Sequence, residues 1–328
     1  MYCRLYRSSD FPVCALLVEP GFKVSAGLRT AIPALWQRLF VAGQLHGAVV
    51  VDPDVSGPES IVAFSMGVFV DDAFVADYLR APSPYPAALV YEQILAGRSP
   101  VLATKDLAAS NASGNLTLLI LHFAIRDNST PHDDRGLAVL TVFQSAFRLM
   151  YEGYRMKRVL QEAYGAEQLP FFTAGGFLLK SDYPSQAEQR SVQTLPGELR
   201  PYLMGAYRDD PHTRYLGTGL SYLFQWVEPR FCFSAAEQRV LLRALMDESD
   251  EAISDTLAIS HDAVKKTWRR IHDRVVDVAA TAPDLFADLM DADTTRGKEK
   301  RRRLLHYLRY HLEELRPVAR QPKTADRA

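Results

Sequence analysis

The stretch Leu116–Ala124, LTLLILHFA, is a short apolar run bounded by turn-forming residues. Runs of this length and composition are typical of well-buried β-strands. Three further runs have the same character: Val13–Glu19, His46–Asp52 and Ile61–Asp71. The sequence therefore predicts several buried strands in its N-terminal half.

Helical patterns separate these strand candidates. Gly27–Gln44 has apolar residues at helical spacing, with Pro33 expected near a helix start. Pro86–Gly97 and Gly136–Tyr154 are further helix candidates, and a strand candidate begins at Arg155. Strands that alternate with helices favour a mixed α/β domain over residues 1–180.

The composition changes beyond this domain. Ser181–Arg200 is polar and reads as a loop or linker, and the apolar runs Pro201–Arg208 and Leu220–Glu228 are expected to form a hairpin within residues 181–230. After Pro229 the pattern is helical almost to the end. We therefore predict an α+β chain, with a mixed α/β domain followed by an all-helical domain.

The whole chain has the composition of a soluble globular protein. Of its 328 residues 48% are hydrophobic and 23% charged, and no apolar run approaches the ~20 residues that span a bilayer. The start MYCRLYRSSD lacks the apolar core of a secretory signal, so we expect a cytoplasmic protein without membrane contact. Residues 261–328 contain 16 Lys and Arg against 11 Asp and Glu, whereas the rest is acidic. A basic C-terminal portion is typical of a nucleic-acid-binding module, and also of solvated helix faces.

Three serines in the C-terminal part indicate where helices begin. Ser234, Ser249 and Ser260 each stand where an N-cap would begin a helix. Two short helices joined by a tight turn are therefore expected on either side of Ala258–Ser260, as in a helix-turn-helix. The helix expected after Ser260 has one apolar stripe, formed by Val264, Trp268, Ile271 and Val275. Its other sides are basic and carry Lys265, Lys266, Arg269, Arg270 and Arg274.

Phe233–Val275 resembles the C-terminal DNA-binding domain of LuxR/GerE-type transcription regulators, through residues such as Ser234, Glu237, Ile253 and Ile259. The resemblance places this domain at residues 231–295 and its recognition helix in the major groove. Arg and Lys can donate to guanine, and phosphate contacts supply most of the affinity. The implied DNA-binding residues are Ser249, Ser260, Lys265, Lys266, Thr267, Arg269 and Arg270.

On this interpretation the chain is a transcription regulator and not an enzyme. The expected partners are double-stranded DNA, an unknown small-molecule ligand at the N-terminal domain, and a second copy of the chain, because one helix-turn-helix reads only a half-site. RNA polymerase is a further candidate partner, since region four of sigma factors shares the local pattern. Gly297–Arg316, within residues 296–328, is predicted to be a basic amphipathic helix with its leucine stripe at Leu304, Leu308, Leu312 and Leu315.

The alternative is an acetyltransferase-like enzyme with a helical appendage. The order of elements from Asp133 to Phe177 resembles the second half of a GNAT acetyltransferase domain, in which a loop at a helix start holds the pyrophosphate of acetyl-CoA. Gly136 and Ala138 fit the last two positions of that loop, but Asp133 stands at the first, where a carboxylate would repel phosphate. Phe171 and Phe172 lie where the family often offers a tyrosine as general acid, and a phenyl ring has no proton to give.

Other polar residues give weaker signals. His122 and Cys14 each lie inside a strand candidate and read as core residues, whereas His132-Asp133-Asp134 reads as a solvated turn. Cys3, Cys14 and Cys232 are too widely spaced for a CxxC metal pattern or a disulfide framework. The sequence therefore predicts no catalytic residue, no metal and no cofactor.

Overall fold

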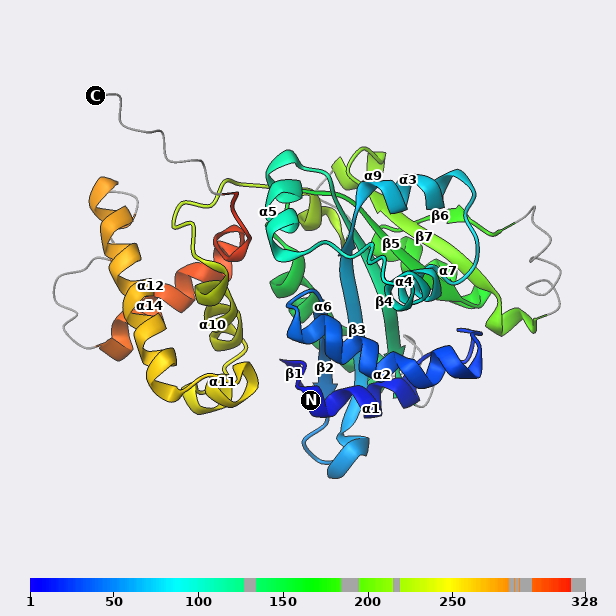
Figure 1. Cartoon of the computed structure of the whole chain (residues 1–328), viewed down its shortest axis with the longest axis horizontal. Coiled ribbons are helices and arrows are strands. Elements are labelled where there is room, and N and C mark those ends of the chain that lie inside the picture. The colour runs from blue at the N-terminus through cyan, green and yellow to red at the C-terminus, as the bar shows by residue number, and fades with distance from the viewer. Residues whose placement is uncertain are drawn as a thin grey trace.

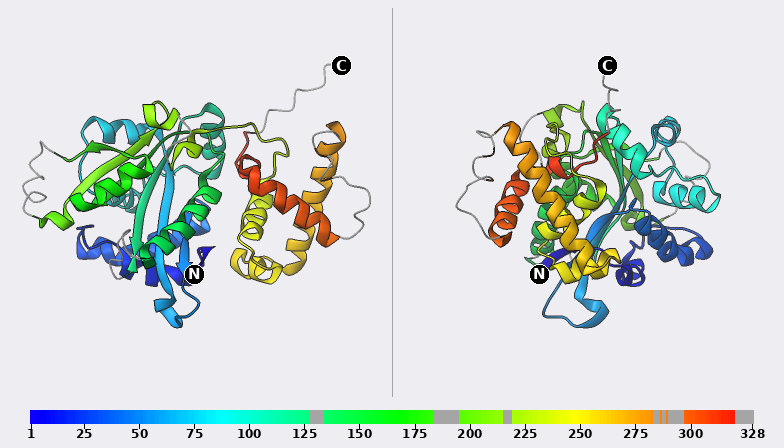
Figure 2. Two further views of the ribbon diagram at one scale, coloured as in Figure 1. Left: turned by 180° about the vertical axis from the view of Figure 1, so that it is seen from behind. Right: turned by 60° about the vertical axis from the view of Figure 1, so that its left-hand side comes forward.

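The computed structural model describes residues 1–126, 134–183, 195–214, 219–282, 286, 289 and 297–319. They divide into a sheet part, residues 1–228, and a helical part, residues 229–319, which lies beside it (Figures 1 and 2). No helix of these described residues is long and apolar enough to cross a membrane.

The described residues of the sheet part form one sheet of seven strands. Their order across the sheet is β1-β2-β3-β4-β5-β7-β6. All neighbours are antiparallel except β4 and β5, which are parallel. The strands are β1 (Tyr2–Leu5), β2 (His46–Val51), β3 (Ile61–Val70), β4 (Leu116–Ile125), β5 (Met156–Tyr164), β6 (Leu178–Ser181) and β7 (Pro201–Tyr207).

Helices cover both faces of this sheet. The first face packs against α1 (Phe11–Leu17), α2 (Ala26–Val41), α3 (Asp72–Arg80) and α4 (Pro86–Leu95). The second face packs against α5 (Thr104–Ser113), α6 (Asp134–Tyr151) and α7 (Leu169–Gly175). Short helical turns complete the connections: Ser8–Asp10, Gly57–Ser60, Ala166–Gln168, Gly197–Leu199, α9 (Pro211–Arg214) and Ser221–Phe224. The result is a three-layered mixed α/β structure (Figure 1).

Three local expectations need correction. Val13–Glu19 is not a strand, because Pro12 in the first turn favours a helix and α1 ends at Leu17. Pro33 lies inside α2, whose N-cap is Ser25. Pro201–Arg208 and Leu220–Glu228 do not pair as a hairpin: β7 pairs instead with β5 and β6, while Ser221–Phe224 form a 3-10 turn.

The helical part has the boundaries that its serine caps predict. It contains α10 (Ala235–Leu245), α11 (Asp250–Leu257), α12 (His261–Thr281), α14 (Gly297–Tyr310) and the 3-10 turn Leu312–Leu315. The hydroxyls of Ser234, Ser249 and Ser260 each accept a backbone N–H in the first turn of the helix that follows. The leucine stripe of α14 and the following turn is buried, together with Val264, Trp268, Ile271 and Val275, in one core.

Arg316 joins the two parts. Its side chain is 2% exposed, and its guanidinium donates to the carbonyl oxygens of Leu149 (2.8 Å) and Glu152 (2.6 Å) at the end of α6. The same guanidinium lies over the ring of Tyr154, 4.7 Å from its centroid. Because a buried cation must be fully hydrogen-bonded to offset its lost hydration, this residue fixes how the C-terminal segment meets the sheet part.

We expect Arg316→Ala to lower the free energy of unfolding by about 2–4 kcal/mol, because two carbonyl groups lose their charged donor and the packing of a buried side chain is removed. Urea unfolding followed by circular dichroism measures this change. Arg309→Ala is the matched control, since Arg309 pairs with Asp247 at the surface, and its effect should stay below about 1 kcal/mol. Equal effects of the two substitutions would contradict the assigned role of Arg316.

Candidate active site

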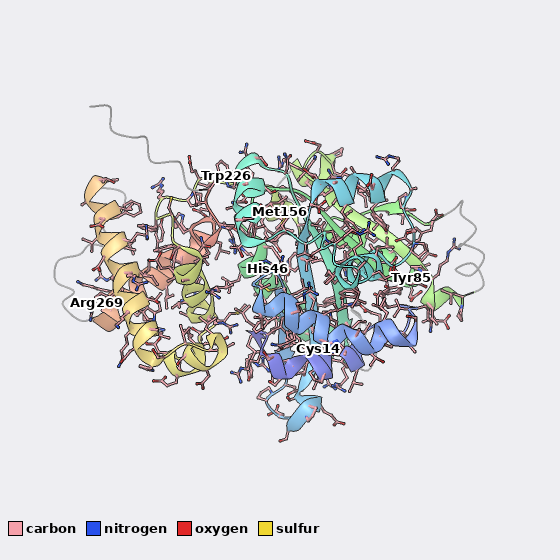
Figure 3. The ribbon with its side chains drawn as sticks, viewed as in Figure 1. Cys14, His46, Tyr85, Met156, Trp226 and Arg269 are labelled. Carbon is pink, nitrogen blue, oxygen red and sulfur yellow. The ribbon has the colours of Figure 1, made fainter. Side chains whose placement is uncertain are left out.

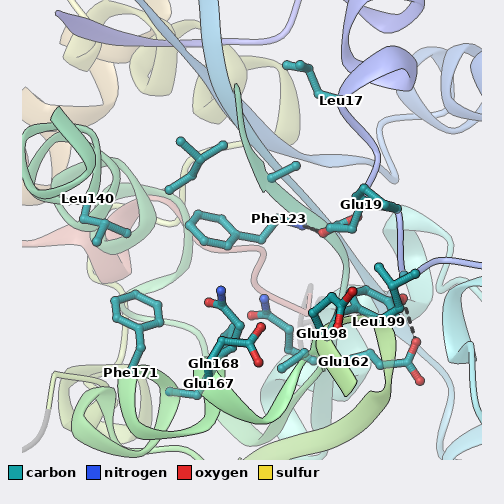
Figure 4. A pocket seen from close by; sticks show the side chains of 18 residues that line it. Leu17, Glu19, Phe123, Leu140, Glu162, Glu167, Gln168, Phe171, Glu198 and Leu199 are labelled. Atoms are coloured by element: carbon teal, nitrogen blue, oxygen red, sulfur yellow. Dashed lines mark hydrogen bonds between the residues drawn. The ribbon is translucent and has the colours of Figure 1, made fainter. Parts of the chain in front are cut away.

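The sheet opens between its two parallel strands. Pairing of β4 with β5 runs from Leu116–Met156 to Ile120–Gln161 and ends there, although β4 continues to Ile125 and β5 to Tyr164. Beyond this point each strand stays paired with its outer neighbour, β4 with β3 and β5 with β7. The two strands therefore diverge, and a cavity of about 380 Å³ lies between them (Figure 4).

A β-bulge lies at the start of this opening. On β3, Gly67 pairs with Ile120 and Met66 with His122, so Leu121 is the extra residue on β4. A bulge reverses the alternation of side chains. Leu121 and His122 consequently both face the first side of the sheet, where the His122 ring meets the aromatic side chains of Phe22, Trp36, Phe64 and Tyr91.

Glu19 reaches the opening from the segment after α1. One oxygen of its carboxylate accepts the backbone N–H of Phe123 (2.9 Å), and the other lies 3.3 Å from Nδ1 of His122. This carboxylate thus occupies the edge of β4 that β5 has left. The segment that carries Glu19 passes close to the Tyr164 ring of β5 at Gly21, where a Cβ would collide with this ring.

Hydrogen bonds connect His122 to partners on both of its ring nitrogens. Trp36 Nε1 donates to the Tyr91 hydroxyl (2.8 Å), which lies 2.9 Å from His122 Nε2. Nδ1 of the same ring lies 3.3 Å from the Glu19 carboxylate. A buried hydrogen-bonded chain therefore runs from Trp36 through Tyr91 and His122 to Glu19.

Glu162 is the second carboxylate in the opening. Its oxygens accept from the Tyr164 hydroxyl (2.7 Å), the Tyr183 hydroxyl (2.7 Å) and the backbone N–H of Tyr85 (2.8 Å). Burial raises the pKa of Glu162 to about 7 from its ordinary 4.5, with a further contribution from Glu19 and against the effect of these hydrogen bonds. A carboxylate with a pKa near neutrality is suited to accept and return a proton.

A second cavity, of about 290 Å³, adjoins the first on the other side of the sheet. The two share Phe123, Leu140, Gln161, Phe171 and Phe172 in their linings. Most of the second lining is apolar, and it adds the rings of Phe143, Phe147, Phe177 and Tyr222. We call the first space the carboxylate cavity and the second the aromatic cavity.

The residues that the sequence predicts to bind DNA lie in the helical part, and none of them lines either cavity. Ser249, Ser260, Lys265, Lys266, Arg269 and Arg270 are exposed on α11 and α12 or at their starts. Figure 3 places Arg269 on the side of the helical part that faces away from the sheet part. Thr267 is not available for DNA, because its side chain is buried and its hydroxyl donates to the Ala263 carbonyl oxygen (2.9 Å).

The GNAT-like motif is only partly within the described residues. His132 and Asp133 lie outside them, whereas Asp134, Gly136 and Ala138 belong to the first turns of α6. Phe171 and Phe172, which offer no proton, are part of the wall between the two cavities. Cys14 is buried as expected, and burial raises the pKa of its thiol. His122 is equally buried, yet its hydrogen bond to Glu19 connects it to the opening.

Sequence reasoning missed Glu19 and Glu162. No local sequence pattern indicates a functional role for either residue, because the groups that surround each side chain come from distant segments. The one indication in the sequence was the presence of a glutamate, Glu162, within the apolar strand candidate that starts at Arg155. A carboxylate inside a buried strand needs partners, and here three tyrosines supply them.

Comparisons with known proteins found structural neighbours only. No protein-family model matches the chain, and no curated protein matches it. One similar structure is FeeM, an N-acyl amino acid synthase from uncultured soil microbes, with 11% identity, a TM-score of 0.31, and coverage of 63% of this chain and 95% of that one. Another is the GphF GNAT-like decarboxylase in complex with isobutyryl-CoA, with 14% identity, a TM-score of 0.36, and coverage of 63% and 99%.

These comparisons contradict the main functional expectation. Both neighbours are enzymes, so the interpretation of the chain as a DNA-binding transcription regulator without enzymatic activity is wrong. They do not support the LuxR/GerE-type helix-turn-helix domain. The second neighbour is itself described as GNAT-like.

The raised pKa of Glu162 predicts a pH-dependent stability. Between about pH 4.5 and pH 7 the folded protein holds this proton more tightly than the unfolded chain does, so the contribution of Glu162 to stability falls as the pH rises through that window. Glu162→Gln should remove this component. The free energy of unfolding of the variant, relative to wild type, should therefore be higher at about pH 8 than at about pH 5.

Urea unfolding at both pH values measures the difference. Glu59→Gln is the control, because Glu59 is exposed in the Gly57–Ser60 turn and should leave the pH dependence unchanged. The same pH dependence in wild type and Glu162→Gln would show that burial does not raise the Glu162 pKa.

Proposed function

We propose that the chain is a GNAT-like acyl-transfer enzyme whose acyl thioester substrate enters the opening between β4 and β5. The divergence of these parallel strands is the observation that supports this proposal most strongly. It leaves strand edges within the sheet that β4 and β5 do not share, of which Glu19 holds the Phe123 N–H, and an extended amide-bearing arm can add to the rest of such an edge through backbone hydrogen bonds. The Glu19 carboxylate, bonded to the Phe123 N–H, indicates that this edge accepts a polar partner.

The aromatic cavity suits the acyl chain of that thioester. Its lining from α6, α7 and the segment Gly219–Tyr222 is dominated by phenylalanine rings. Apolar chains gain free energy in proportion to the area they bury, so a chain of several carbons benefits from this space and an acetyl group does not fill it. The proposed donor is therefore a thioester with an acyl group longer than acetyl.

Two neighbouring residues of β5 supply the chemistry. Glu162 accepts the proton of the nucleophile, whose lone pair attacks the thioester carbonyl carbon. The Gln161 side-chain amide, at the wall between the cavities, donates a hydrogen bond to the carbonyl oxygen as negative charge develops there. The carbon–sulfur bond then breaks, the acyl group stays on the nucleophile, and the thiolate leaves and takes up a proton.

Octanoyl-CoA binding tests this assignment. We expect calorimetry to show binding that is tighter for octanoyl-CoA than for acetyl-CoA. Leu140→Trp should weaken octanoyl-CoA binding at least about tenfold, because the larger ring fills the passage that Leu140 lines in both cavities. Leu137→Trp on the same helix is the matched control, since Leu137 is 58% exposed and lines neither cavity.

Release of free thiol, followed with a thiol-reactive dye in the presence of a panel of amines, measures turnover. Glu162→Gln should lower the rate by roughly a hundredfold or more while octanoyl-CoA still binds. Absence of acyl-CoA binding by the wild-type protein, or equal loss of binding in the two tryptophan variants, would overturn the proposed function.

A further inference from the structure

The carboxylate cavity is lined by acidic side chains without basic ones. Glu19 and Glu162 are partly buried within it, and Glu167 and Glu198 stand exposed at its rim. Of the described residues that line it, none is Lys, Arg or His. A concave space with one sign of charge concentrates ligands of the opposite sign.

The hydrogen-bond partners of Glu162 bring no positive charge to the carboxylate cavity. They are the hydroxyls of Tyr164 and Tyr183 and the Tyr85 N–H, which are neutral donors. Glu19 is in contact with His122, which lies behind it and is not part of the cavity lining. Arg200 follows the lining residue Leu199 but stacks its guanidinium over the Tyr202 ring, 5.6 Å from the centroid.

Gln161 gives independent evidence for a ligand at this place. Its side chain is 8% exposed and lines both cavities. Within the described part of the chain no protein group bonds to its amide, and the amide atoms are not among the fully enclosed polar atoms that lack a partner, so they open onto the cavities. Polar groups in such a place are normally hydrogen-bonded, so the Gln161 amide is available to a polar group of a bound molecule. A thioester or amide carbonyl at the junction of the cavities provides that group.

We propose that the acyl acceptor is a cationic amine with at least one further positive charge, such as a diamine or polyamine, bound in the carboxylate cavity. This inference depends on the proposed acyl transfer. The amine that reacts lies beside Glu162 and Gln161, and the second cationic group lies toward Glu167 and Glu198. The same lining includes the Phe171 ring, and aromatic rings attract cations.

The reaction balances with these groups alone. The bound ammonium group gives one proton to Glu162 and becomes a nucleophilic amine. Its nitrogen forms a bond to the thioester carbonyl carbon, and the carbon–sulfur bond breaks. The second proton lost from the nitrogen goes to the departing thiolate, and the products are a neutral amide, a free thiol and the proton held by Glu162.

Calorimetry with spermidine and 1,4-diaminobutane, on the full-length protein without thioester, tests the acceptor site directly. Both amines should bind, more weakly as salt is added, since rim charges are screened. Mono-N-acetyl-1,4-diaminobutane should bind more weakly than the diamine because it lacks one charge, and glutamate should not bind. The double variant Glu167→Gln/Glu198→Gln should weaken spermidine binding about three- to tenfold, whereas Glu59→Gln should leave it unchanged.

Failure of this inference is distinguishable from failure of the proposed function. Octanoyl-CoA binding without any binding of the two amines would overturn the acceptor assignment and leave acyl transfer standing. Equal binding of diamine and its mono-acetylated form, or an unchanged affinity in the double variant, would also overturn it. Amine binding without octanoyl-CoA binding would overturn the proposed function itself. Amine-dependent thiol release that is lowered in the double variant would support both.

Discussion

The separation of β4 from β5 is the constraint on which the rest of the site depends. Both strands are anchored on their outer sides, so the sheet stays continuous while its centre opens after Ile120 and Gln161. The bulge at Leu121 adds a bend on the β4 side at the same level. An opening inside a sheet leaves backbone groups that need partners, and the Glu19 carboxylate supplies one of them.

The opening connects two chemically different spaces. On the α6 side phenylalanine rings form the aromatic cavity, and on the other side Glu19, Glu162 and Tyr164 are part of the lining of the carboxylate cavity. Gln161 lies at their junction because it is the last residue of β5 that pairs with β4. The helical part contacts the sheet part at several places: Arg316 at the end of α6, Pro317 at Asn111 of α5, and Arg243 at Tyr6. The contact of Arg316 connects the helical part to the helix that lines both cavities.

The sequence predicts what depends on local chemistry. Ser234, Ser249 and Ser260 cap their helices because a serine hydroxyl and the N–H groups of the next turn are close in the chain, and strands such as Leu116–Ile125 follow from their apolar composition. The same local pattern cannot distinguish a helix pair that reads DNA from one that serves another role, and that inference was wrong. Glu19 and Glu162 could not be found, because the groups that tune them come from α4, β4, β5 and the segment at Tyr183. Short apolar runs are also ambiguous, as α1 shows.

A crystal structure of the protein with bound octanoyl-CoA tests the central claim most directly. The extended arm of the thioester should lie between β4 and β5 beyond Ile120 and Gln161. The thioester carbonyl oxygen should be within hydrogen-bond distance of the Gln161 amide, and the octanoyl chain should lie among the rings of Phe143, Phe147 and Phe177. An octanoyl-CoA molecule bound elsewhere on the chain, with the space between the two strands unchanged, would contradict it.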